Sequence, residues 1–329
     1  MSIARKLAAA LAAATFAALL PAAAHAEYPE KTITIIVPYP AGGVTDLTAR
    51  ALADGLAKRV PQPVVVLNKP GAGATIGGGA VAAAAPDGYT LGFFPLAAVV
   101  PEVFRFRYTA PYTTTDLKAI AAVAATAMSF AVKADAPLKS MGDVVALARR
   151  QNGVQIGTPG PQTLPSMIMV QMSAKERVKL DEISFGGDAK TLPALLGGHI
   201  QVGAIDYAAL RSSVEAGKIR VLAVCTEKRV DFLPNVPTVL ELGYPLPYVS
   251  SLGVFGPKTL PPQLVKKLEE LVAAVVNDPE FVNRMKSLTI QTAYKDSASY
   301  QKAVLRDRDN LETFFRQQGM YDKPAPGAK

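Results

Sequence analysis

The segment TITIIVPYPAGGVTDLTAR, residues 32–50, predicts a strand, a glycine turn and a helix in immediate succession. Ile33, Ile35 and Val37 alternate with other residues, as in a strand that buries one face. Beyond the turn, apolar residues recur at the three- and four-residue spacing of a helix, and they are Leu47, Ala51, Leu52 and Leu56. A strand that leads through a short turn into a helix is the repeating unit of α/β folds.

The turn contains two adjacent glycines, Gly42 and Gly43, and little side-chain material. The first N–H groups of a helix have no intrahelical acceptor, and the helix dipole is positive at that end. Glycine also lets a ligand approach the backbone closely. We therefore expect this turn to bind an anion, with a tight structural turn as the alternative.

Residues 1–26 have the pattern of a secretory signal peptide. Arg5 and Lys6 precede an apolar run at residues 7–20, and the small-residue sequence AHA ends at Ala26. The apolar run is too short for a membrane-spanning helix. The sequence therefore predicts an exported, periplasmic protein whose mature chain begins at Glu27, with an uncleaved anchor as the alternative.

The charge of the chain is basic but dispersed. Its 35 Lys and Arg residues against 27 Asp and Glu residues give a formal net charge of +8. No run of five or six like charges occurs, which argues against a nucleic-acid-binding tract, whereas a mild positive field favours anionic small molecules. Cys225 is the only cysteine, so an intramolecular disulfide is excluded, and its apolar context VLAVC predicts a buried structural thiol.

The recognisable motifs of common catalytic and metal sites are absent from the sequence. Signal-peptide cleavage would remove His25 and leave His199 as the one histidine, and no H-E-x-x-H, G-x-S-x-G or C-x-x-C motif occurs. Met167, Met169 and Met172 could suggest a copper site, but on a helix they fill gaps in the core. We therefore expect no metal, no cofactor and no enzymatic activity.

The sequence GAGATIGG, residues 71–78, is similar to the G-x-G-x-x-G dinucleotide fingerprint but departs from it. Its third glycine, Gly77, comes one position late, and residues 68–70 separate the glycines from the strand predicted at 64–67. We expect a structural loop that leads into a helix at residues 76–85 rather than a nucleotide site.

Strands and helices alternate along most of the chain, which predicts parallel sheets covered by helices. Ligand sites in such folds lie beyond the carboxyl ends of the strands. Two segments, residues 119–132 and the proline-rich residues 233–257, have the character of crossings between two lobes. With a helical C-terminal part that returns to the first lobe, the pattern predicts a hinged clamp.

Six blocks of sequence occur in the order and spacing of the Bug-type periplasmic solute receptors: YPEKTITIIVPYPAGGVTDLTARALADGL, VVVLNKPGAGATIGG, APDGYTLG, ALLGGHIQVG, AGKIRVLAV and NVPTVLELGY. The chain resembles this family, the substrate-binding proteins of tripartite tricarboxylate transporters, over nearly the whole mature sequence. The resemblance implies an α/β fold of the two-lobed periplasmic binding proteins (type II-like), in which two crossing strands join two mostly parallel sheets flanked by helices. It predicts one lobe at residues 27–127 and 248–329 and a second lobe at residues 128–247.

The resemblance also implies that a ligand carboxylate is held between two strand–helix loops, one from each lobe, largely by backbone amides. These loops correspond to residues 39–46 and 157–166. Asp46 should brace the first loop because like charges repel, although an amino-bearing ligand could use it as a counter-charge. The hydroxyls of Thr158 and Thr163 can donate to an oxyanion or cap a helix. The predicted ligand-binding residues are Tyr39, Ala41, Gly42, Gly43, Thr45, Asp46, Thr158, Gly160, Gln162, Thr163, Ser166, Gly187, Asp188 and Asp206.

The chain departs from the family pattern near the expected cleft. Gln162 stands where glycine is common, Ser166 where histidine is common, and Ser251 where tryptophan is often found. These changes leave the predicted fold intact. The identity of the ligand stays open among mono-, di- and tricarboxylates, aromatic acids and amino acids.

The sequence and the resemblance together predict a monomeric receptor that binds a small carboxylate and delivers it to the subunits of a membrane transporter. Two alternatives remain. The receptor could present its ligand to a membrane sensor kinase, or the protein could be a periplasmic hydrolase. The lack of a nucleophile–histidine pair argues against the hydrolase.

Overall fold

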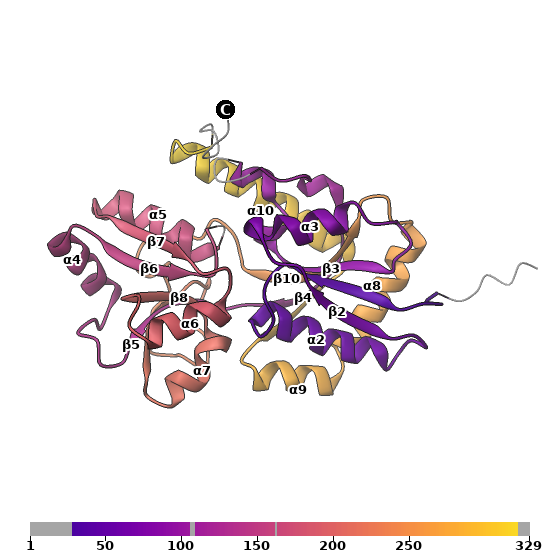
Figure 1. Cartoon of the computed structure of the whole chain (residues 1–329), viewed down its shortest axis with the longest axis horizontal. Helices are drawn as coiled ribbons and strands as arrows, with labels where there is room; N and C mark the ends of the chain where they lie inside the picture. The colour runs from indigo at the N-terminus through magenta and orange to yellow at the C-terminus, as the bar shows by residue number, and fades with distance from the viewer. Residues whose placement is uncertain (1–27, 106–108, 162, 322–329) are drawn as a thin grey trace, which may run out of the picture. The chain divides into compact units, whose positions relative to one another are not determined.

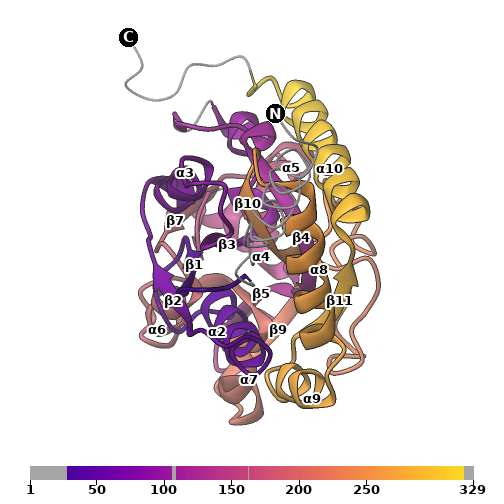
Figure 2. The same cartoon turned by 90° about the vertical axis from the view of Figure 1, so that its right-hand side faces the viewer.

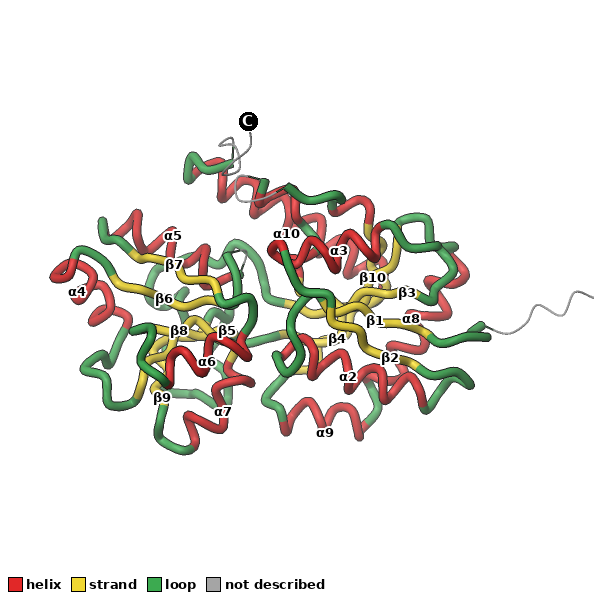
Figure 3. The backbone as a smooth tube through the Cα atoms, viewed as in Figure 1, coloured by secondary structure: helices red, strands yellow, loops and turns green. Residues whose placement is uncertain are grey.

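The computed structural model describes residues 28–105, 109–161 and 163–321, and from Lys31 onward they form one compact unit. The predicted signal peptide, residues 1–26, lies outside the described residues. Two β-sheets with helices packed on their faces make up the compact unit (Figure 1, Figure 3). Within the described part of the chain, no helix has the length and apolar character needed to span a membrane.

The first sheet has six strands in the order β11-β4-β10-β3-β1-β2. β1 runs parallel to β2 and β3, whereas β10 runs antiparallel to β3 and β4, and β11 antiparallel to β4. Its strands are β1 (Ile33–Val37), β2 (Val64–Asn68), β3 (Thr90–Pro95), β4 (Leu117–Ala125), β10 (Ser251–Pro257) and β11 (Gln291–Lys295).

The second sheet has five strands in the order β7-β6-β8-β5-β9. β6 runs parallel to β7 and β8, whereas β5 runs antiparallel to β8 and β9. Its strands are β5 (Met128–Lys133), β6 (Val154–Thr158), β7 (Leu180–Ser184), β8 (Val202–Asp206) and β9 (Ile219–Val224).

The predicted fold class is confirmed, but each sheet is mixed rather than mostly parallel. Only Thr126 and Ala127 separate β4 from β5, so the chain passes directly from one sheet to the other. It then enters the second sheet at the end where the parallel strands finish, and β5 must run against them. The second crossing, between β9 and β10, returns the chain to the first sheet. The lobe boundaries at 127/128 and 247/248 stay a prediction.

Among the described residues, five helices pack on the first sheet and four on the second. Figure 3 shows the first sheet between α3 and α10 on one side and α2 and α9 on the other, and Figure 2 shows α8 and α10 alongside β4. The helices of the first group are α2 (Val44–Ala57), α3 (Thr75–Ala82), α8 (Pro262–Val276), α9 (Pro279–Ser287) and α10 (Ser297–Gln317). Those of the second group are α4 (Met141–Gln151), α5 (Leu164–Glu176), α6 (Asp188–Leu196) and α7 (Tyr207–Glu215).

β1 is buried on both faces rather than on the one face that its alternation predicts. Ile33, Ile35 and Val37 are at most 2% exposed, but Ile36 is also only 3% exposed. Both α2 and α3 pack against this strand. A strand in the interior of a helix-covered sheet has no face left for solvent, which accounts for its nearly continuous apolar run.

The glycine-rich segment at residues 71–78 leads into α3, Thr75–Ala82, where the sequence predicts a helix at residues 76–85. Gly77 and Gly78 lie in the first turn of α3. A Cβ at Gly77 would come within 3.0 Å of the Lys69 carbonyl oxygen and of Pro38, and a Cβ at Gly78 would collide with the Tyr112 ring. The glycines therefore allow close packing of this helix against its neighbours.

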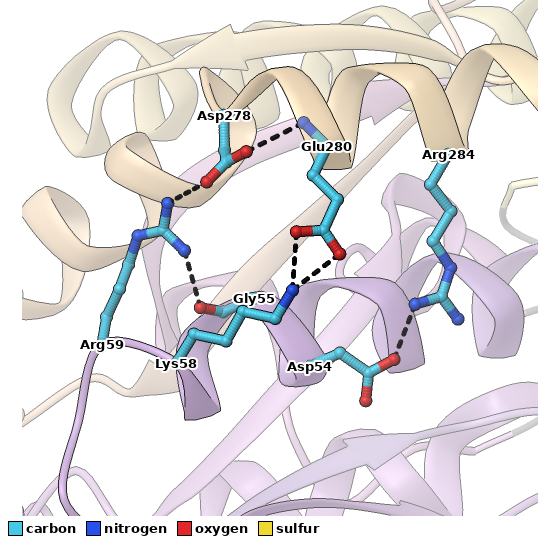
Figure 4. A network of polar contacts seen from close by, with 7 residues as sticks. All are labelled: Asp54, Gly55, Lys58, Arg59, Asp278, Glu280 and Arg284. Atoms are coloured by element: carbon cyan, nitrogen blue, oxygen red, sulfur yellow. Dashed lines mark hydrogen bonds and ion pairs between the residues drawn. The ribbon is translucent and has the colours of Figure 1, made fainter.

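Ion pairs join α2 and its C-cap residue to α9, which is more than 200 residues further along the chain (Figure 4). Lys58 Nζ lies 2.6 Å from Glu280 Oε1, and Arg284 Nη1 lies 2.6 Å from Asp54 Oδ2. These exposed pairs each contribute little to stability. They show nevertheless that the C-terminal helices pack beside the first helix of the first sheet.

Candidate functional site

A cavity of about 70 Å³ lies between the strand–helix loops of the two sheets. Apolar side chains form much of its wall, and these include Pro40, Pro95, Met128, Pro159 and Leu252. A largely apolar wall with a few polar groups is typical of sites for small organic molecules.

The N-terminal ends of four helices meet at this cavity. Residues from the first turns or N-caps of α2, α5, α6 and α7 line it, and they follow β1, β6, β7 and β8 respectively. Each helix start carries the positive end of a helix dipole, and its first N–H groups have no intrahelical acceptor. At α7, however, the N–H groups of Tyr207 and Ala208 already donate to the Ala127 carbonyl oxygen and to Asp206 Oδ1. Together the helix starts make the cavity favourable for a negatively charged group.

The two glycines of the β1–α2 turn have different structural roles. Gly42 has a φ of 86°, which glycine adopts readily, and its N–H donates to Asp46 Oδ2 at 2.9 Å. Gly43 is the N-cap of α2, has an ordinary φ of −81° and lines the cavity. A Cβ at Gly43 would meet no atom within 4 Å. The fold therefore does not require glycine at position 43, and its missing side chain leaves the cavity open beside α2.

The first turn of α2 supplies the donors on this side of the cavity. The Leu47 N–H donates to the Gly43 carbonyl oxygen at 2.9 Å, and this is the start of the helical ladder. The N–H groups of Val44 and Thr45 precede it and have no acceptor within the helix. Both residues line the cavity.

Asp46 braces the β1–α2 loop, as predicted, and does not line the cavity. Asp46 is 2% exposed, and its carboxylate accepts hydrogen bonds from Arg50 Nε at 3.0 Å and Asn68 Nδ2 at 2.9 Å, besides that from Gly42. Asn68 Nδ2 also donates to the Tyr39 carbonyl oxygen at 3.0 Å. Burial acts to raise the pKa of Asp46, but these hydrogen bonds and the Arg50 charge outweigh it and hold the pKa below its usual value.

The loop after β6 uses its hydroxyls differently from the expectation. Thr163 is the N-cap of α5 and lines the cavity, but its hydroxyl donates to the Gly160 carbonyl oxygen at 2.9 Å. The hydroxyl of Thr158 donates to Glu182 Oε1 at 2.8 Å, and that of Ser166 also donates to Glu182. Thr158 and Ser166 therefore satisfy a neighbouring carboxylate on β7 instead of facing the cavity.

Two aspartates from the second sheet do line the cavity. Asp188 is the first residue of α6, after the N-cap Gly187, and Asp206 is the N-cap of α7. The Asp206 N–H donates to Asp188 Oδ1 at 3.2 Å, and Asp206 Oδ1 accepts from the Ala208 N–H at 3.0 Å. Burial raises the pKa of both carboxyls, and the charge of Asp206 raises that of Asp188 further.

The two crossings supply cavity residues that sequence reasoning missed. Thr126 lies between β4 and β5, and Tyr248 and Ser250 precede β10. The hydroxyl oxygens of Thr126 and Ser250 are 2.6 Å apart, so a hydrogen bond joins the two crossings at the cavity. The segments themselves were recognised as crossings, and a chain that passes between two lobes must run along the cleft. That reasoning could have identified these residues.

The structure thus brings together part of the predicted site. The predicted residues that line the cavity are Tyr39, Gly43, Thr45, Thr163, Gly187, Asp188 and Asp206. The predicted residues that are described but do not line it are Ala41, Gly42, Asp46, Thr158, Gly160 and Ser166. Gln162 lies outside the described residues. Which of these residues contact a ligand stays a prediction.

The residues that the structure describes include neither a candidate metal site nor a reactive cysteine. No group of three or more His, Cys, Asp and Glu side chains there could hold a metal ion. Cys225 is buried, and burial raises the pKa of its thiol well above the usual value. A buried protonated thiol is unreactive.

The chain is similar to known proteins along most of its length. A family model described as "Tripartite tricarboxylate transporter family receptor" matches residues 48–319. The "UPF0065 protein in gbd 5'region" of Cupriavidus necator is 35% identical over 303 residues, which cover 91% of each chain.

Two solved structures are similar in both sequence and fold. The periplasmic binding protein BugD is 27% identical, with a TM-score of 0.81 over 89% of this chain and 99% of that chain. The protein Rpa4515 of R. palustris, solved with adipate, is 25% identical, with a TM-score of 0.81 and the same coverage. The family model is that of a receptor, and BugD is a periplasmic binding protein; neither is described as an enzyme.

Proposed function

This chain belongs to the tripartite tricarboxylate transporter family of receptors, and on that premise we propose that it binds a small organic carboxylate in the periplasm. The bound carboxylate occupies the cavity between the two sheets, and the receptor then delivers it as a monomer to the subunits of a membrane transporter. The family is one of solute-binding receptors, and the chain is not an enzyme.

The meeting of four helix N-termini at one cavity is the observation that carries this proposal. The N–H groups of Val44 and Thr45 approach the cavity from the first sheet, and the starts of α5 and α6 approach it from the second. Charge-assisted hydrogen bonds from N–H groups to a carboxylate are stronger than neutral ones. The structure of a relative with adipate supports the same chemical class of ligand.

The two crossings give the proposed site its hinge. Thr126 and Ser250 link them, and both residues also line the cavity. A ligand that contacts both sheets stabilises the arrangement in which they are close together. Closure removes water from the carboxylate and strengthens its hydrogen bonds to the helix starts.

A thermal-shift screen followed by calorimetric titration tests the binding of an acid. The panel contains mono-, di- and tricarboxylates, aromatic acids and amino acids, with NAD and ATP as control ligands. At about 100 times its Kd, an acid that binds only the folded protein adds about 2.7 kcal/mol of stability, which raises the melting temperature by several degrees. If no acid shifts the melting temperature and a nucleotide does, the proposal is wrong.

Delivery to a transporter needs a test in cells. Uptake of the labelled acid should fall when the gene is deleted and return when the wild-type gene is restored. A Gly43→Glu gene, whose product we expect to fold without binding the acid, should not restore uptake. Unchanged uptake in the deletion strain would contradict a role in transport. It would not contradict binding of the acid, which the calorimetric titration measures separately.

A further inference from the structure

Asp188 and Asp206 form an acidic pair on the cavity wall. The Asp206 N–H donates to Asp188 Oδ1 at 3.2 Å, which holds the β7–α6 and β8–α7 loops together. Both carboxyls belong to residues that line the cavity. The pair comes from neighbouring loops of one lobe and therefore keeps its geometry when the lobes move.

The pair has unsatisfied hydrogen-bonding capacity. Asp206 is only 3% exposed, and its Oδ2 is buried with no hydrogen-bond partner among the described residues. In the described part of the chain, neither carboxylate forms an ion pair. This holds also for Lys190, which lines the same cavity but is not paired with Asp188 or Asp206. Burial raises the pKa of Asp206 and outweighs the Thr126 hydroxyl and the Ala127 N–H, which act to lower it. A buried carboxylate oxygen without a hydrogen-bond partner is costly for a fold, and a donor group on a ligand in the cavity would remove that cost.

The side chains on the two sides of the cavity differ in charge. The β1–α2 side presents backbone N–H groups and no acidic side chain, because Asp46 is turned to Arg50 and Asn68. The α6–α7 side presents Asp188 and Asp206. A ligand that carried only negative charge would suit the first side and be repelled by the second. A ligand with an ammonium group beside its carboxylate would suit both.

We propose that the Asp188–Asp206 pair binds a protonated amino group, so that the natural ligand of this receptor is an amino acid or another small aminocarboxylate. This inference rests on the proposed function and names its class of ligand. An ammonium group carries three N–H donors, and Asp206 Oδ2 offers an acceptor for one of them. The carboxylate of the same ligand then lies at the N-terminus of α2.

Matched pairs of acids that differ only in an amino group provide the test. Aspartate is compared with succinate, glutamate with glutarate, and 2-aminoadipate with adipate, each by calorimetric titration of the wild-type protein. At least one amino-bearing acid should bind roughly ten- to a hundredfold more tightly than its partner, as expected for one added hydrogen bond between charged groups. Equal or weaker binding of the amino-bearing acid in all pairs overturns the inference. Binding of none of the six acids, nor of any in the wider panel, would instead contradict the proposed function.

Asp206→Asn and Asp188→Asn remove one negative charge each while keeping an acceptor oxygen. Asparagine is a good N-cap, so Asp206→Asn should leave α7 intact. Each variant should lose most of the preference for the amino-bearing acid. The binding of the matched acid that lacks the amino group should not become weaker. Asp181→Asn on β7 is the control and should change neither affinity, because the Asp181 side chain is 42% exposed and pairs with Lys179. A preference that survives in both folded pair variants contradicts the inference.

Proton exchange gives a second readout that does not depend on a variant. The other ionisable side chains that line the cavity are Lys190, Tyr39 and Tyr248. An ammonium group favours the ionised pair, so its binding at about pH 6 should release protons, whereas a carboxylate held near the pair should take protons up. Titration in buffers of different ionisation enthalpy measures the sign. Uptake on binding of an amino-bearing acid would overturn the inference.

Discussion

Asp46 and Asp206 are both buried aspartates at the start of a helix, one on each side of the cavity, but their surroundings differ. Asp46 accepts hydrogen bonds from Gly42, Arg50 and Asn68, and its pKa is lowered. Asp206 caps α7 with one oxygen and leaves the other without a partner among the described residues, and its pKa is raised by burial.

This difference separates an acid that serves the fold from one that is available to a ligand. The loop around Asp46 is complete in the absence of any ligand because its donors and acceptors satisfy one another. The Asp188–Asp206 pair reduces stability when it is ionised and unoccupied. Natural proteins retain such groups where function requires them, and Asp206 Oδ2 is such a group in a residue that lines the cavity.

Gly43→Glu is the change with the largest expected effect, because it adds an unpaired acid to the side of the cavity that has none. The new carboxylate would compete for the N–H groups of Val44 and Thr45 and repel the ligand carboxylate. Loss of two charge-assisted hydrogen bonds should weaken binding by at least about a hundredfold. Calorimetric titration and a melting curve measure both quantities. A folded variant that binds at wild-type strength would falsify the role of this turn.

Asp46→Ala removes the acid that is fully paired and should affect stability more than any other aspartate change here. Gly42, Asn68 and Arg50 lose a shared acceptor, and Arg50 is 43% exposed, so water compensates in part. We expect a loss of about 2 kcal/mol in the free energy of unfolding by urea.

Asp54→Ala on the same helix is the control for Asp46→Ala. Its carboxylate is 62% exposed and pairs with Arg284 at the surface. The loss should stay below about 0.5 kcal/mol. Equal losses of unfolding free energy in the two variants would show that the buried hydrogen bonds of Asp46 stabilise the fold no more than the exposed ion pair of Asp54.

The two acidic sites should respond to pH with opposite signs. The lowered pKa of Asp46 means that this residue stabilises the folded protein at pH values above its pKa in the unfolded chain, about 3.8. That stabilisation is lost as the pH falls through the lowered pKa of the folded protein. The pKa of Asp188 is raised to about 7 and that of Asp206 to about 6, so their favourable contribution is complete below about 3.8 and is lost as pH rises through these values.

Melting curves of the ligand-free protein from pH 4 to pH 9 measure this response. Asp188→Asn should reduce the fall in melting temperature between pH 5 and pH 8. An unchanged pH profile in that variant would contradict the assignment of the titration to the pair.

Gly42→Ala and Gly43→Ala should give the smallest effects and separate the two glycines. Gly42 has a positive φ, so alanine there should cost about 1 kcal/mol of stability. At Gly43 alanine should leave stability unchanged, because its Cβ meets nothing, but should weaken ligand binding severalfold.

Gly142→Ala, in the first turn of α4, is the control for both. Its Cβ would make an ordinary contact with Ser140, at 3.4 Å. Affinity should not change. If Gly43→Ala lost as much stability as Gly42→Ala, both glycines would be needed for the structure of the turn and not for ligand binding.

Local sequence was sufficient for the elements that open the fold and for the position of the first binding loop. Residues 32–50 predict β1, the glycine turn and α2, and the structure has them at Ile33–Val37, Gly42–Gly43 and Val44–Ala57. Ser140 and Asp143, three residues apart, likewise form a capping box at the start of α4. These features depend on residues a few positions apart, so the sequence contains all the information that they need.

The tertiary structure alone decided which polar groups remain free for a ligand. The sequence could not show that Glu182 takes the hydroxyls of Thr158 and Ser166, because it lies 24 and 16 residues further along the chain. Nor could it show that Asn68, 22 residues away, completes the environment of Asp46, whereas Asp206 Oδ2 is left without a hydrogen-bond partner among the described residues. A polar group is satisfied by whatever the fold places beside it. The identity of those neighbours depends on the packing of distant segments and not on the local pattern of residues.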